Sequence, residues 1–150
     1  MLQVGDFIAV ANLAAQVCQA LSATSGSKAQ FESLLAILNA VGQAMIRAEA
    51  ACMEFYSSLS NCSDEKDKYL HIDEVADDIV IQRNQCDALL ASFLHRYKSY
   101  QKSFIGQGSG RLKQGYKSLV FQIHKEDIIK FEKELQGRLQ ALQLLLNTFY

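Results

Sequence analysis

The sequence of 150 residues contains neither proline nor tryptophan. Because proline interrupts helix interiors, its absence favours long, uninterrupted helices. No charge of one sign dominates either: 15 basic and 16 acidic side chains leave a formal net charge of −1, whereas dedicated nucleic-acid binders are usually basic. With 49% hydrophobic and 21% charged residues, the composition indicates one globular domain over residues 1–150. It excludes collagen-like, disulfide-knotted and multi-span membrane proteins.

Metal-binding and redox cysteine motifs are also absent. The four cysteines are Cys18, Cys52, Cys62 and Cys86, and their spacing contains no CxxC pair and no zinc signature. Three of them lie in apolar helical surroundings, where an unpaired cysteine behaves as a small buried hydrophobe, while Cys62 lies in a polar segment. We therefore expect reduced thiols and a cytoplasmic protein.

Apolar side chains recur with helical spacing over most of the chain. In the third helical segment, apolar residues repeat every seven positions from Ile72 to Tyr100, which favours left-handed packing of nearly antiparallel helices. The pattern predicts an all-α, up-and-down bundle of four principal long helices plus a short helix. The expected helices span about 7–23, 28–57, 69–104 and 111–121, with the last starting near Lys125.

Polar and glycine-containing segments separate these helices. Asp6 is the expected N-cap of the first helix, and Ser27 to Gln30 resembles a capping box before the second. We expect a loop over residues 58–68. The glycine-rich segment Gly106 to Gly110 predicts a flexible break, and it lacks the Lys-Ser or Lys-Thr pair of a phosphate-binding loop.

No constellation of residues points to catalysis. None of the 3 histidines belongs to a HExxH or Glu-x-x-His motif, and no nucleophile–histidine order is recognisable. Asp73, Glu74, Asp77 and Asp78 form two acidic pairs four residues apart on one helix. A metal cluster is one reading of these carboxylates, but a single helix face supplies ligands from one side only, so a solvated stripe is favoured. The chain is expected not to be an enzyme and to need no cofactor.

Charge is distributed unevenly along the sequence. Between Ala88 and Lys125 every charged residue is basic, whereas acidic residues dominate from Asp64 to Asp78. The basic run has three readings: a contact for anionic phospholipid, a contact for the acidic run of another subunit, and an ordinary solvated face. The residues expected to make a lipid or partner contact are Arg96, Lys98, Lys102, Arg111, Lys113 and Lys117.

The N-terminal segment carries one charge, Asp6, between Met1 and Leu21. As a helix, 21 residues reach about 31 Å, close to the thickness of the hydrocarbon core of a bilayer. Its glutamines and asparagine make a permanent span unfavourable, and it lacks the positive start of a signal peptide. Two readings remain: a buried bundle helix, and a helix that is buried at rest and inserts into membrane once released. The residues expected to insert are Leu2, Phe7, Ile8, Val10, Leu13, Val17 and Leu21.

Four segments in order resemble one family. Val4 to Val10 resembles the opening of fungal N-terminal domains that precede NACHT-type and other STAND modules or ankyrin repeats. Phe93 to Tyr100 is similar to the "FL..Y..Y" end of a helix in those domains, and Gln114 to Phe121 to their basic "W.K..F" segment, with Tyr116 near the tryptophan. Gly137 to Leu146 is similar to their closing helix.

This family is similar to the HeLo and HeLo-like helical domains of fungal heterokaryon incompatibility proteins, which are likened to the bundle of mixed-lineage kinase-like executioners and to coiled-coil domains of plant immune receptors. The resemblance implies the N-terminal effector domain of an NLR-like protein of innate immunity and programmed cell death. In such proteins a cytoplasmic bundle oligomerises, exposes its N-terminal helix and permeabilises the plasma membrane.

A second hypothesis needs no membrane. In it, the bundle is a non-lytic helical adaptor that self-associates or docks an NLR or other signalling partner. Apolar residues outside the core stripes are its expected contacts, namely Ile46, Ile81 and Leu144. Neither hypothesis involves nucleic acid.

Overall fold

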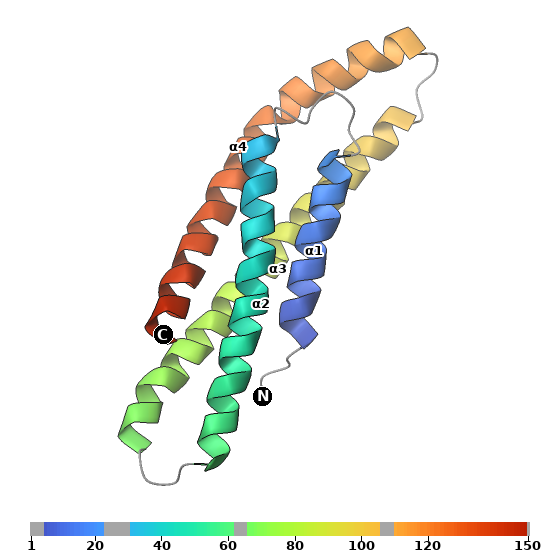
Figure 1. Ribbon diagram of the computed structural model, residues 1–150. Coiled ribbons are helices and arrows are strands. Elements are labelled where there is room, and N and C mark those ends of the chain that lie inside the picture. Colours follow the sequence, from blue (N-terminus) through green and yellow to red (C-terminus); the bar gives the residue numbers. More distant parts are fainter. Residues whose placement is uncertain (1–4, 23–30, 62–65, 106–109, 150) are drawn as a thin grey trace.

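The computed structural model describes residues 5–22, 31–61, 66–105 and 110–149, and its side chains over 6–22, 31–57, 73–99 and 125–148. These residues form helices and, within the described ranges, no strand (Figure 1). The predicted all-α class is therefore confirmed. The helices are α1 (Gly5–Ser22), α2 (Glu32–Asn61), α3 (Lys66–Ile105) and α4 (Gly110–Phe149).

The four helices alternate in direction, as an up-and-down bundle requires (Figure 1). Helix α1 packs against α2 and α3, and α4 packs against the same two helices. Among the described residues α1 and α4 share no contact, so these two helices occupy opposite corners of the bundle. Helices α2 and α3 follow each other in the chain but contact each other little, because they form the other diagonal.

The expected short helix is not a separate element. Helix α4 runs without interruption from Gly110 to Phe149 and so joins the predicted segments 111–121 and 125 onwards. The three residues between Phe121 and Lys125 include neither glycine nor proline, so no residue there breaks the helix. The described part of the chain therefore forms four helices, two of them 40 residues long.

Two predicted helix starts differ from the structure. Helix α1 begins at Gly5, which places Asp6 in the first turn rather than at the N-cap. The predicted capping box at 27–30 lies outside the described residues. Helix α2 begins instead after Phe31, whose carbonyl oxygen accepts the amide of Leu35 at 2.8 Å. The predicted loop over 58–68 is shorter than expected, because α2 continues to Asn61 and α3 starts at Lys66.

All four helices contribute apolar stripes to one core, as the periodicity predicts. Between α3 and α4 the rings of Phe93 and Phe131 stack with centroids 4.0 Å apart and planes at 6°. Tyr56, near the C-terminal end of α2, is 38% exposed. The largest fully buried side chains come from every helix and include Phe7, Val17, Leu21, Phe31, Leu34, Leu38, Met45, Ile79, Leu90, Leu135, Leu142 and Leu146.

Candidate functional site

The apolar stripe of α1 faces the bundle core. Most of the residues predicted to insert into membrane are at most 2% exposed, so at rest they pack against α2 and α3. Two differ: Leu13 is half-buried, and Ile8 is 47% exposed. Leu2 lies outside the described residues. The buried members of the set are Phe7, Val10, Val17 and Leu21.

The outer face of α1 is uncharged and carries polar side chains together with the exposed Ile8. Asn12, Gln16 and Gln19 are exposed along it, and Cys18 on the α2 side lies 4.0 Å from the amide oxygen of Asn39. The 18 residues of α1 reach about 27 Å, slightly less than the roughly 30 Å of a hydrocarbon core. Helix α1 is thus amphipathic, with an apolar inner face and no charged side chain on its outer face.

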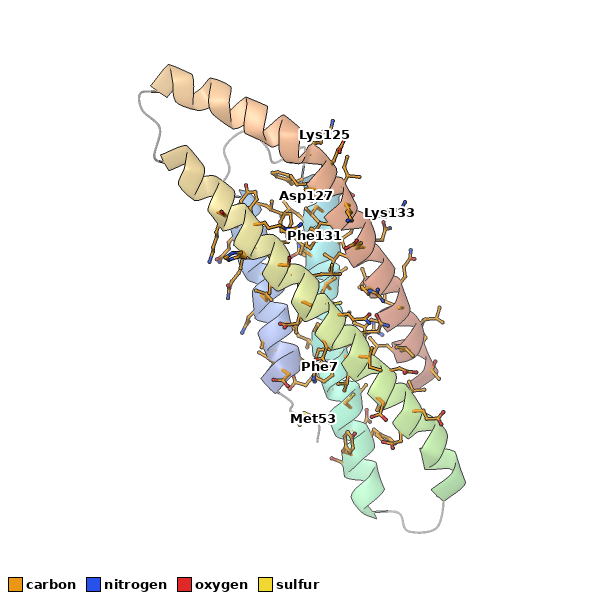
Figure 2. The ribbon with its side chains drawn as sticks, turned by 180° about the vertical axis from the view of Figure 1, so that it is seen from behind. Phe7, Met53, Lys125, Asp127, Phe131 and Lys133 are labelled. Atoms are coloured by element: carbon orange, nitrogen blue, oxygen red, sulfur yellow. The ribbon has the colours of Figure 1, made fainter. Side chains whose placement is uncertain are left out.

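The single charge of α1 is paired with a buried arginine on α3. Arg83 is 7% exposed, and within the described part of the chain it is the one buried charged residue. Its Nη2 atom lies 3.6 Å from Oδ2 of Asp6, whose side chain is 48% exposed. The guanidinium carbon also lies 4.8 Å from the centroid of the Phe7 ring, at the N-terminal end of α1 (Figure 2). Two consecutive residues of α1, Asp6 and Phe7, therefore contact the guanidinium of Arg83 on α3.

The remaining donors of Arg83 are incompletely satisfied. Nε and Nη2 lie 3.3 and 3.2 Å from the side-chain oxygen of Asn84, the next residue of α3. Nη1 is buried and has no hydrogen-bond partner among the described residues. An unsatisfied buried donor costs free energy. Arg83 is therefore a destabilising polar group in the otherwise apolar layer between α1 and α3.

The sequence interpretation missed Arg83, although a signal was present. Counting by sevens along α3 from Ala76 gives Arg83, Leu90 and Tyr97, so a charge stands in a column that is otherwise apolar. A charge at such a core position requires a partner. The N-terminal segment offers one acidic residue, Asp6, and the fold brings the two together.

The cysteines are placed as predicted where they are described. Cys52 and Cys86 are fully buried, and Cys18 is half-buried. Burial raises the pKa of Cys52 to about 11, an effect that the nearby charge of Arg83 partly offsets. Burial likewise raises the pKa of Cys86 to about 11. These thiols stay protonated near neutral pH, which is typical of structural rather than reactive cysteines. Cys62 lies outside the described residues.

The predicted basic contact is described only in part. Lys98 is exposed, whereas Nη1 of Arg96 lies 3.4 Å from Oδ2 of Asp127 on α4. The positive charge of Arg96 is therefore shared with a carboxylate, which weakens its attraction for an anionic surface. The side chains of the other four predicted contacts lie outside the described residues, namely Lys102, Arg111, Lys113 and Lys117.

A shallow groove of about 320 Å³ lies beside the Arg96–Asp127 pair, between α3 and α4. Its lining combines the apolar side chains of Leu89 and Phe131 with both charge signs, from Arg96 and Lys130 on one hand and Asp127 and Glu134 on the other. Figure 2 labels Asp127 and Phe131 on α4. The groove lacks a buried acid, base or nucleophile arranged for catalysis within its described lining.

The acidic residues of α3 point into solvent. Asp73, Glu74, Asp77 and Asp78 are all exposed, and His95 is exposed as well. Among the residues with described side chains, no three histidine, cysteine or acidic groups gather in a way that would hold a metal ion. The side chains of the other two histidines are not described.

By length and composition, the helix apolar enough to cross a membrane is α2 rather than α1. Among the described residues, the segment Glu32–Ser57 meets this criterion, and 39% of its apolar window is buried within the bundle. Core helices of water-soluble bundles have the same properties, so this feature alone is weak support for insertion. In the fold, the two most apolar helices, α1 and α2, pack against each other.

Comparison of the chain with protein-family models, curated proteins and solved structures finds no match.

Proposed function

We propose that this chain is a HeLo-like N-terminal effector domain of a fungal NLR-like or incompatibility protein. At rest it is a cytoplasmic bundle. On activation the chains oligomerise, α1 leaves the bundle, and the released helices permeabilise the plasma membrane to cause regulated cell death. In an oligomer, the uncharged polar faces of several α1 helices surround water while their apolar faces contact lipid.

The observation that carries this proposal is the position of α1. It occupies one corner of the bundle, and among the described residues it contacts α2 and α3 but not α4. Its departure therefore leaves the packing of α4 against α2 and α3 in place. Lipid can replace the apolar contacts that its buried stripe loses, because transfer of apolar side chains out of water is favourable in either environment.

An exposed position on α1 provides a test that does not disturb the core. Ile8→Glu places a charge on a side chain that is already 47% exposed, so the resting bundle tolerates it. As α1 enters the bilayer, before other helices enclose its outer face, the same charge contacts lipid, at a cost of about 2.5–3.5 kcal/mol if it reaches the bilayer centre. We expect Ile8→Glu to reduce dye release from vesicles of mixed neutral and anionic phospholipid at least tenfold.

The matched control is Ile129→Glu on α4, where the same residue type is 53% exposed. It carries the same charge change and leaves leakage within about twofold of the unsubstituted chain, because a surface substitution of this kind barely changes the fold. Absence of leakage from the unsubstituted chain, including after induced oligomerisation, would exclude membrane permeabilisation. Equal loss in both variants would exclude a specific role of α1.

The exposed apolar residues favour a second candidate, a non-lytic adaptor. Ile46, Ile81 and Leu144 are 58%, 49% and 74% exposed, as the adaptor hypothesis expects of contact residues. They lie on three different helices, α2, α3 and α4. Sedimentation velocity over a wide concentration range tests this function. If the chain is monomeric at every concentration and causes no leakage, self-association is excluded and docking of a different partner remains as the adaptor function.

A further inference from the structure

We propose that Arg83 sets how readily α1 leaves the bundle, because the closed bundle buries this charge and α1 itself carries the groups that compensate it. In this inference, Arg83 favours release of α1, and Asp6 opposes release. Its role in cell death rests on the proposed function. The opening of α1, in contrast, is a property of the folded chain in water.

The first step is the cost of burying Arg83. The guanidinium side chain is 8% exposed, although in water all five of its N–H donors would be hydrated. Burial of a charge costs desolvation free energy, which only excellent geometry and further hydrogen bonds offset. The buried Nη1 lacks a hydrogen-bond partner among the described residues, so this desolvation cost is only partly offset.

The second step is the origin of the compensation. Asn84 belongs to α3 and accompanies Arg83 whether or not α1 is in place. The carboxylate of Asp6 and the ring of Phe7 are neighbours on α1 and leave with it. The Asp6–Arg83 distance of 3.6 Å exceeds that of a good charge-assisted hydrogen bond, and the half-exposed carboxylate is already hydrated.

The third step follows from these two. When α1 leaves, Arg83 regains water and Asp6 loses little, so hydration of Arg83 favours the open bundle. Removing the carboxylate from α1 raises the cost of the closed state. Removing the charge from α3 lowers that cost, because an apolar side chain of similar volume is often neutral or stabilising at such a position. Substitutions at the two ends of one ion pair therefore have opposite effects.

Hydrogen exchange of the α1 amides, measured on the full chain in buffer without lipid, tests this directly. We expect Asp6→Asn to speed exchange about tenfold and Arg83→Met to slow it by a similar factor. In the Arg83→Met background the ion pair is already absent, so Asp6→Asn changes the exchange rate of the α1 amides by less than about twofold. Exchange of α4 amides over 125–148 reports global unfolding in every variant.

The surface pair between α3 and α4 supplies the control. Arg96→Met and Asp127→Asn also alter an ion pair, but those side chains are 42% and 34% exposed, and the pair links α3 to α4 rather than to α1. We expect both to change α1 exchange by less than about twofold, since exposed ion pairs contribute little.

Three results would overturn the inference. If Arg83→Met speeds α1 exchange, the ion pair is simply stabilising. If Asp6→Asn acts equally in both backgrounds, the two residues are not coupled. Asp6→Asn, at a half-exposed position, keeps the fold, so its failure to loosen α1 would count against the inference even if Arg83→Met unfolds. If exchange shifts as expected but vesicle leakage is absent, the proposed function fails and the role of Arg83 stands.

Discussion

The two helical hairpins of this bundle, α1–α2 and α3–α4, have similar cores and different exteriors. Residues 1–61 carry six of the charged side chains, namely Asp6, Lys28, Glu32, Arg47, Glu49 and Glu54, and residues 62–150 carry all the others. From Ser33 to Ile46 no charge occurs at all. The α3–α4 hairpin presents an ordinary water-facing surface, while the α1–α2 hairpin presents one that loses little hydration when covered by lipid or protein.

The polar contacts of the hairpins differ in the same way. Arg96 and Asp127 join α3 to α4 at the surface, where an ion pair contributes little to stability. Arg83 and Asp6 join α3 to α1 with the guanidinium buried and the carboxylate half-exposed, so the balance between burial and pairing matters for Arg83. We interpret the α3–α4 hairpin as a frame that keeps its packing when α1 leaves. Besides the buried apolar stripe of α1, one buried charge then bears on how firmly α1 is attached.

The frame interpretation is tested at the stacked rings between α3 and α4. Phe131→Ala removes a ring that stacks on Phe93 at 4.0 Å, and the resulting cavity costs about 3–5 kcal/mol. We expect a matching fall in the free energy of unfolding measured with urea, with all helices unfolding together. Ile129→Ala, on the exposed side of α4, is the control and costs less than about 0.5 kcal/mol. A loss below 1 kcal/mol for Phe131→Ala would refute the frame interpretation.

A smaller effect is expected in alkaline solution, where one buried thiol in each hairpin titrates. Cys52 and Cys86 have an ordinary pKa of 9.0 that burial raises to about 11. Well below pH 9, for example near neutral pH, both thiols are protonated in the folded and unfolded chain alike. As pH rises from 9 to about 11 the unfolded chain loses these protons first, so stability falls by about 2 kcal/mol per thiol.

Urea titrations at a series of pH values measure this fall, and Cys52→Ala and Cys86→Ala variants assign it. Each substitution is expected to make the decline of unfolding free energy with pH less steep, independently of its effect at neutral pH. A decline that stays equally steep in both variants would show that other groups cause it. If the two thiols contribute equally to the fall in unfolding free energy, the interiors of the two hairpins exclude water equally, despite their different exteriors.

The smallest effect concerns the exteriors themselves. Ile46 on α2 and Ile81 on α3 are 58% and 49% exposed, but Ile46 lies on the hairpin with few charges. If this hairpin forms the surface that associates, Ile46→Gln weakens self-association several-fold, by about 1 kcal/mol, while Ile81→Gln has no effect. Sedimentation velocity compares the two variants. A larger loss with Ile81→Gln would reverse the assignment of the surfaces.

Local pattern was enough to predict most of the fold. The helical class, the core stripes and the burial of Cys52 and Cys86 follow from periodicity, because apolar side chains leave water whatever their partners are. The errors occurred at helix ends. Asp6 was predicted to cap α1 and instead faces Arg83, and α4 continues through the break expected after Phe121. Distant contacts and the absence of helix breakers decide such boundaries.

The candidate site was less predictable. The N-terminal segment was recognised as apolar and nearly uncharged, which its composition shows directly. Arg83 was overlooked: its place in an apolar column of α3 indicates burial, but its partner Asp6 is far away in the sequence and is brought to it only by the fold. The expected basic contact was also changed by a residue distant in sequence, because Asp127 on the neighbouring helix α4 pairs with Arg96.

The order of amino acids thus specified which faces avoid water, and with them the helices and the apolar character of α1, because hydrophobic burial depends on each segment's own periodicity. Which helices became neighbours was a matter of three-dimensional packing. That packing placed α1 opposite α4 and put Asp6 and Phe7 against Arg83. A buried charge acquires its energetic meaning from groups distant in sequence, since its cost depends on the partners and the water around it.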